Sequence, residues 1–180
     1  MTRSRSGALV VVAALTALTG CSMNNSDDSK KTEIAGTRSV KDVDDEAKKL
    51  SSQLYDLAAL KGENSGGGPG SSECGDDKDR NFLIRHSWSV TGASDAEAAQ
   101  AMDRVKEGLP RQGWEVVSYE RLKNKANTLA LTADHHEKKF GVRVELWEKG
   151  KVGDDNPPAL RFSLVSGCFQ VPEGEKAEHY

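Results

Sequence analysis

The segment FLIRHSWSV, residues 82–90, alternates two kinds of side chain with a period of two. One set is largely apolar and consists of Phe82, Ile84, His86, Trp88 and Val90, whereas the other set includes Arg85, Ser87 and Ser89. Successive side chains of a strand point to opposite faces of its sheet. The segment therefore predicts a strand with one buried face and one wet face.

The residues that follow this strand predict a helix. Ser94 and Glu97 in the motif SDAE have the spacing of a capping box, in which each side chain bonds a backbone N–H of the first turn. The next apolar residues share one side of a helix and are Ala98, Met102, Val105 and Leu109. Pro110 and Gly113 indicate where this helix ends.

Four further strands are predicted at about residues 114–122, 128–133, 139–148 and 159–169. The last three alternate apolar and polar residues, and the short connections between strands, such as DHHEKK at 134–139, favour antiparallel hairpins. The predicted fold class is α+β. We expect a mostly antiparallel sheet of about five strands with one packed helix, preceded by an N-terminal helix.

The N-terminal helix is predicted over residues 42–62. Its apolar residues recur at spacings of three and four and are Val43, Ala47, Leu50, Leu54 and Leu57. This narrow apolar face fits packing on the domain, and it also fits a seam with a helix of a partner. Residues 63–73 have the glycine and proline content of a linker. The globular domain is then expected over 74–172, with a polar tail over 173–180.

The first twenty residues have the layout of a secretory signal, with Arg3 and Arg5 before a short apolar stretch. The apolar residues 8–18 would extend only about 16 Å as a helix, against a hydrocarbon core of about 30 Å. The stretch LTGC, residues 18–21, resembles the lipobox of bacterial prolipoproteins. A thiol becomes nucleophilic near neutral pH, so Cys21 is the predicted site of lipidation, and acyl chains on Cys21 would anchor the protein. Residues 21–41 are predicted to be a flexible polar tether.

The charge of the chain disfavours nucleic acid as a partner. The formal net charge is −3, and removal of the two arginines with residues 1–20 would change it to −5. A mildly acidic domain has no overall attraction for a phosphate backbone. The membrane, reached through the lipid anchor, is thus the expected partner, together with an envelope protein or a cell-wall component.

Once Cys21 is lipidated, Cys74 and Cys168 remain, and thiols outside the cytoplasm usually pair. A disulfide between them would close a loop of 94 residues, for which the chain-entropy model gives about 4.5 kcal/mol. The alternative is a catalytic cysteine beside His86 or His136. The disulfide is the favoured prediction, because an oxidising compartment would consume such a thiol.

Three other patterns fail as sites. Adjacent residues of DHHEKK point to opposite faces of a hairpin, so they predict a solvated turn and no metal centre. DDKDRNF resembles the start of a calcium loop, yet Phe82 and Trp88 stand where glycine and glutamate are needed. GGGPG lacks the lysine of a phosphate loop. No catalytic set, metal or cofactor is therefore predicted.

Two residues are candidates for binding. His86 lies on the apolar face of the strand that contains it, where a hydrogen-bonded core histidine is the ordinary explanation and a binding role the alternative. Trp147 lies on the wet face, together with Arg143 and Glu145, where an exposed aromatic side chain can anchor a partner.

Several segments together resemble uncharacterised lipoproteins of actinomycetes. They are the lipobox, YDLAALKG, RHSWSVTG, LPRQGWEVVSY and SGCFQVPEGE. The resemblance implies export and residence on the outer face of the cell membrane, and it implies no activity. The sequence predicts a non-enzymatic, lipid-anchored protein that displays a disulfide-linked domain to an envelope protein or cell-wall component. The alternative is a small-ligand-binding lipoprotein with a pocket between the sheet and the helix at 98–109.

Overall fold

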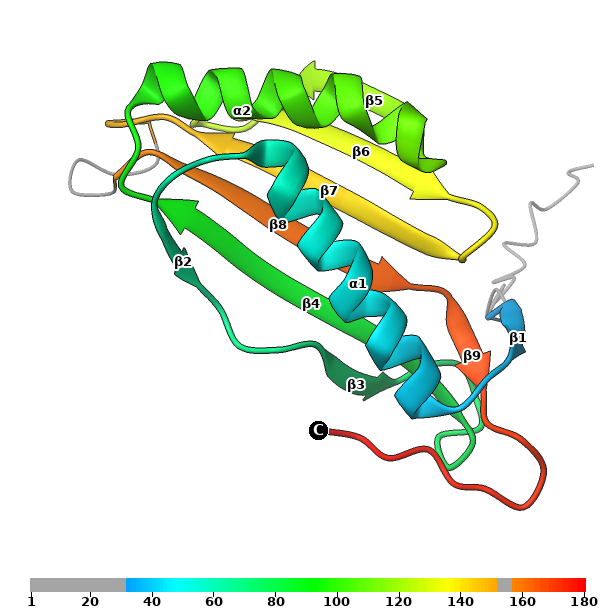
Figure 1. The fold of residues 1–180 in the computed structure, drawn as a ribbon. Coiled ribbons are helices and arrows are strands. Elements are labelled where there is room, and N and C mark those ends of the chain that lie inside the picture. Colours follow the sequence, from blue (N-terminus) through cyan, green and yellow to red (C-terminus); the bar gives the residue numbers. More distant parts are fainter. Residues whose placement is uncertain (1–31, 152–156) are drawn as a thin grey trace, which may run out of the picture. The chain divides into compact units, whose positions relative to one another are not determined.

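Strand β4 (Asn81–Thr91) is the central strand of a sheet in the computed structural model, which describes residues 32–151 and 157–180. On one side β4 pairs antiparallel with β8 (Ala159–Ser166) and β9 (Cys168–Gln170), and on its other side with β2 (Glu63–Ser65) and β3 (Gly70–Glu73). Figure 1 shows these strands along the length of β4. The alternating segment at 82–90 is thus a strand, as predicted.

The sheet continues from β8 through β7 (Phe140–Trp147) and β6 (Leu129–His135) to β5 (Glu115–Arg121), all antiparallel. At its other end β1 (Ile34–Thr37) pairs parallel with β9. The prediction of about five strands was wrong, because the part of the chain that the structure describes forms a sheet of nine strands. The register of β5 shifts between Val116 and Ser118, where Val117 bulges out and is 57% exposed.

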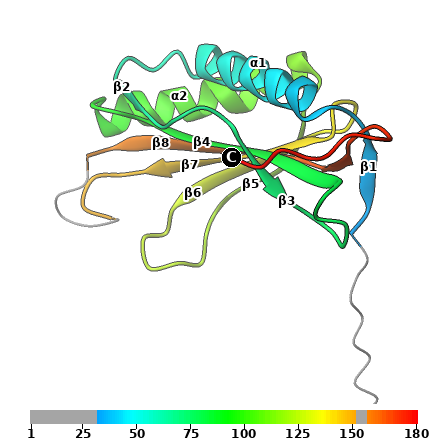
Figure 2. The ribbon, with the colours of Figure 1, turned by 90° about the horizontal axis from the view of Figure 1, so that it is seen from below.

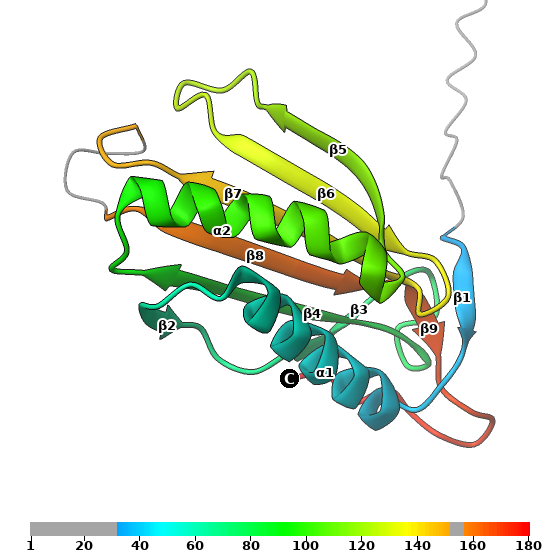
Figure 3. The same cartoon turned by 45° about the horizontal axis from the view of Figure 1, so that its top comes forward.

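Within the described residues, two α-helices pack on one face of this sheet (Figures 2 and 3). They correspond to the predicted packed helix and to the predicted N-terminal helix, for which packing on the domain was one of two alternatives. Helix α1 (Val40–Ala58) begins after its cap Ser39 and ends at Ala59, whose φ is 43°. It stops earlier than the predicted range 42–62. Its apolar residues Val43, Ala47, Leu50 and Leu54 are buried in the main core, so this face packs on the domain.

Helix α2 (Asp95–Gly108) has the predicted capping box. The backbone N–H of Glu97 donates to Ser94 Oγ (3.3 Å), and the backbone N–H of Ser94 donates to Glu97 Oε2 (2.8 Å). A short 3₁₀ helix, η1 (Leu109–Gln112), follows it. Four apolar side chains of this region are fully buried in the core: Ala98, Met102, Val105 and Leu109. None of the helices within 32–151 and 157–180 is long and apolar enough to cross a bilayer.

Parts of three segments that were predicted to lie outside the globular domain belong to it. Residues 63–73 were predicted to be a linker, yet they contain β2 and β3, because their backbone groups pair with β4 whatever their side chains. The predicted tether 21–41 contains β1 and the start of α1. In the predicted tail, Tyr180 N–H donates to Ser71 O (3.2 Å) and Ala177 N–H to Asp79 O (2.8 Å). The signal segment and Cys21 lie outside the described residues.

Candidate functional site

The face of the sheet opposite the two helices is the candidate functional site, and we call it the open face. Figure 2 shows both helices on the other side, and no described helix covers the open face. The alternation within β4 places Arg85, Ser87 and Ser89 there, because Ile84, Trp88 and Val90 are buried beneath the helices. β7 likewise places Arg143, Glu145 and Trp147 on the open face.

Strand register aligns a row of polar side chains across five strands of the open face. The residues in successive register from β4 to β5 are Ser87, Ser163, Arg143, Thr132 and Ser118, which we call the hydroxyl row. Neighbouring strands are about 4.8 Å apart, so four steps between strands make the row about 19 Å long. A ligand that contacts the whole row must therefore be extended.

The open face is hollowed over the β4–β8–β7 part of the hydroxyl row. The hollow has a volume of about 520 Å³. Its polar lining includes Ser87, Ser89, Ser163, Arg143, Glu145 and Arg161. Hydroxyls both donate and accept hydrogen bonds, whereas guanidinium groups only donate. The hollow can therefore contact a polar ligand that carries hydroxyls and an acidic group.

Glu145 organises the charged end of the hollow. Arg143 Nε donates to Glu145 Oε1 (2.7 Å), and Trp147 Nε1–H donates to Glu145 Oε2 (3.1 Å). The Arg161 guanidinium lies 3.5 Å from the centroid of the Trp147 ring, a cation–π contact. Trp147 is on the wet face, as predicted, but it is half-buried because Arg161 covers its ring.

His86 lies on the opposite, helix-covered face and is hydrogen-bonded, as expected for a core histidine. Its Nδ1 is 2.6 Å from Ser51 Oγ and its Nε2 is 2.9 Å from Gly67 O. The ring also packs on Trp88, with centroids 4.6 Å apart. His86 therefore links α1 to the segment between β2 and β3, beside a second hollow of about 400 Å³. It is not brought together with Trp147.

The pocket predicted between the sheet and residues 98–109 is replaced by packed side chains. Met102, Val105 and Leu109 are fully buried in the same core as the β7 and β8 residues that face them. The prediction of a small-ligand pocket at this position is therefore wrong.

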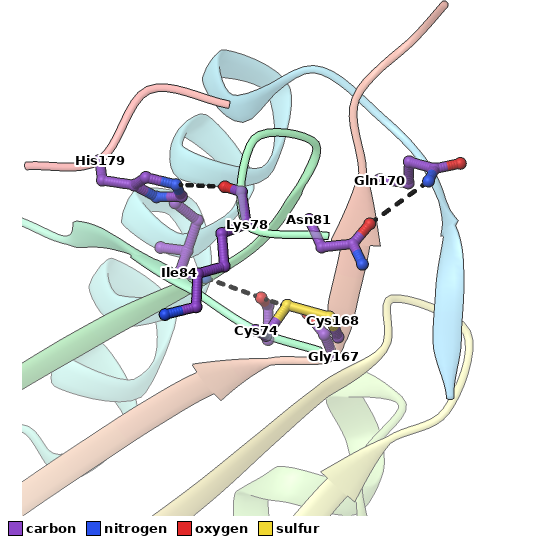
Figure 4. The surroundings of a disulfide bond; sticks show 9 residues. Cys74, Lys78, Asn81, Ile84, Gly167, Cys168, Gln170 and His179 are labelled. Carbon is purple, nitrogen blue, oxygen red and sulfur yellow. Dashed lines mark hydrogen bonds between the residues drawn. A yellow bond between two sulfur atoms is a disulfide. The ribbon is translucent and has the colours of Figure 1, made fainter. Parts of the chain in front are cut away.

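Cys74 and Cys168 form a disulfide, as predicted, with Cα atoms 5.9 Å apart. It joins the residue after β3 to the first residue of β9, beside the start of β4 (Figure 4). Next to it, Gln170 Nε2 donates to Asn81 Oδ1 (3.4 Å). Both cysteines are consumed by this bond, which excludes the catalytic-thiol alternative for the bonded form.

The histidines of DHHEKK point apart. His135 is buried with its ring 5.2 Å from that of Trp114, and His136 is exposed, with Nε2 2.8 Å from Glu115 Oε2. Burial, and then the nearby Lys138, lower the pKa of His135. No group of three or more metal-ligating side chains occurs within the described ranges.

Comparisons with protein-family models, with curated proteins and with solved structures found no match. Arg161 and the serines of the hollow were not among the functional candidates predicted from the sequence. Their polar positions within alternating strands were a usable signal for the wet face. Their convergence on one row depends on strand register, which the sequence pattern does not contain.

Proposed function

We propose that the protein is a non-enzymatic, lipid-anchored envelope protein that binds a component of the extracytoplasmic envelope through the open face. One observation supports the binding role: neither helix covers the hydroxyl row or its hollow. An antiparallel sheet commonly leaves one face in water, so exposure of this face alone does not indicate a ligand. The support comes from the alignment: serine, threonine and arginine side chains form one row over five strands, and the row runs through the hollow.

Two features support the location. The lipobox LTGC offers Cys21 as an attachment point for acyl chains, and two or more chains give a stable anchor. The bond between Cys74 and Cys168 suits an oxidising compartment, where structural disulfides form and persist. The anchor would concentrate the domain beside its target on the outer face of the membrane.

In-cell photo-crosslinking tests the binding role. A photoreactive phenylalanine analogue is placed at Ser163 or Thr132 on the open face, or at Gln100 on the exposed side of α2 as the matched control. We expect adducts with an envelope protein or wall polymer from the two open-face positions only. Equal adduct yields from Gln100, or no adducts from either open-face position, would refute the proposed binding face.

A further inference from the structure

Positive charge gathers at one end of the open face, although the chain carries a formal net charge of −3. Arg85, Arg143 and Arg161 lie on β4, β7 and β8, where Glu145 is the carboxylate lining the hollow. The opposite end of the face, on β6 and β5, instead carries Asp134 and Glu120. An acidic group of a ligand would therefore be attracted to the β4–β8–β7 end.

Two of these arginines and a hydroxyl converge on the hollow. Arg143 is in register with Ser163, and Arg161 lies two residues before Ser163 on the same strand face. Such diagonal neighbours are within reach of long side chains. A guanidinium presents paired donors that match the oxygens of a carboxylate or phosphate, and its charge strengthens those bonds. Glu145 accepts from Arg143 Nε and lies opposite Arg161, so the terminal N–H groups of the two guanidinium groups are the donors left for one acidic group of a ligand.

The hydroxyl row adds a different kind of contact. Ser87 and Ser163 lie within the hollow, and Thr132 and Ser118 extend the row beyond it toward β5. Serine and threonine hydroxyls accept as well as donate, which matches the hydroxyls of a sugar better than the acceptor-only oxygens of a simple anion. A row of about 19 Å also exceeds what one small anion can contact.

Resting on the binding function proposed above, we propose that the ligand of the open face is an acidic polysaccharide. One carboxylate or phosphate group of the polymer lies between Arg143 and Arg161. Only uncharged sugar hydroxyls follow the hydroxyl row toward Ser118, because Asp134 and Glu120 at that end would repel further acidic groups. Glu145 positions Arg143, and the stacking of Arg161 on Trp147 places the second guanidinium.

Titration of the full-length mature chain, purified in detergent, tests this ligand class with four polymers. Polygalacturonate carries carboxylates on sugars, phosphorylated dextran carries phosphates on sugars, dextran is a neutral sugar polymer, and polyglutamate is an anion without sugar. Tryptophan fluorescence is a suitable readout, because Trp88 is among the residues that line the hollow and Trp147 contacts Arg161 beside it. We expect binding of one or both hydroxyl-bearing anions and at least about tenfold weaker binding of the other two polymers.

The two acidic polymers distinguish a carboxylate source from a phosphate source. Binding should weaken with salt, because screening over about 10 Å at 0.1 M reduces attraction at an open surface. Equal affinity for dextran would overturn the acidic requirement, and equal affinity for polyglutamate would overturn the sugar requirement. Failure of all four polymers to bind would overturn the ligand class.

Variants locate the site. Arg143→Gln and Arg161→Gln should each weaken binding about tenfold, whereas Arg111→Gln, on the exposed surface of η1, should leave it unchanged. Near-UV circular dichroism and an unchanged melting temperature establish that each variant is folded, and Ser163→Ala gives a second test that keeps both charges. Unchanged affinity in Arg143→Gln and Arg161→Gln would overturn the proposal. Open-face crosslinks to an envelope protein, without polysaccharide binding, would refute the ligand class alone and leave the binding function standing.

Discussion

Removing the disulfide between Cys74 and Cys168 should destabilise the domain without unfolding it. The bond joins two residues that are 94 positions apart. For a loop of this length, the chain-entropy model predicts a contribution of about 4.5 kcal/mol to the free energy of unfolding. The bond lies at one end of β4, where backbone pairing to β3 and β9 would persist in its absence. The main core does not depend on the disulfide for its packing. Removing a native disulfide from a small secreted domain typically lowers the free energy of unfolding by about 2–5 kcal/mol.

Three variants measure this contribution: Cys74→Ser, Cys168→Ser and the double substitution. Equilibrium urea unfolding under non-reducing conditions should show a similar loss of about 3 kcal/mol in each, because all three remove the same bond. The slope of the transition should also rise, since an unfolded chain without the crosslink exposes more surface. At about 2–4 °C per kcal/mol, the melting temperature should fall by about 6–12 °C.

Additive losses in the double variant would refute this reasoning, since they require independent roles for Cys74 and Cys168. A loss under about 1 kcal/mol would refute the assignment of stability to a closed loop. Thiol labelling gives the direct check. The unreduced protein, unfolded in urea, should show neither Cys74 nor Cys168 as a reactive thiol.

Three further predictions concern the anchor, a helix cap and a buried histidine. Cys21→Ser should move the protein from the membrane pellet to the soluble fraction, because it removes the atom that would carry the lipid; wild-type retention in the pellet would contradict the anchor. Ser94→Ala should lower the free energy of unfolding by about 1 kcal/mol in urea titrations, because the N–H of Glu97 loses its acceptor, and an unchanged midpoint would contradict this. Burial lowers the pKa of His135 below 6.5, so the unfolded chain binds more protons below that pH, and stability should fall as the pH drops from about 6.5 through the folded-state pKa. His135→Gln should flatten this part of the stability profile, and an identical profile in the variant would count against the burial argument.

The elements predicted from the sequence are those in which apolar and polar side chains recur at a regular spacing. β4, β7 and β8 alternate, and α2 has both a capping box and an apolar side. β2 and β3 were missed because they consist of polar residues and one glycine and so show no apolar alternation, and these strands form through backbone bonds to β4. The parallel pairing of β1 with β9 joins segments more than 130 residues apart, which no local pattern indicates.

The candidate site was predictable only strand by strand. The wet face of β7, with Arg143, Glu145 and Trp147, was identified from alternation. The stacking of Arg161 on Trp147 and the alignment of Ser163 with Arg143 follow from the register of β8 against β7. A shift of one residue would place these side chains on the other face, so the site is a property of the pairing and of no single segment.

The strands along the edges of the sheet are short or irregular: β5 and β1 end the sheet path, and β2 and β3, with three and four residues, flank β4. This affects how the protein behaves when many copies are crowded together. β5 is interrupted by the bulge at Val117, and β1 has only four residues and a register shift between Ile34 and Gly36. A long regular edge offers a continuous series of N–H and C=O groups to which a strand from another molecule can add. Bulges and short strands break that series and twist it away. Copies of this domain held at high density on one surface would thus resist joining edge to edge into β-aggregates.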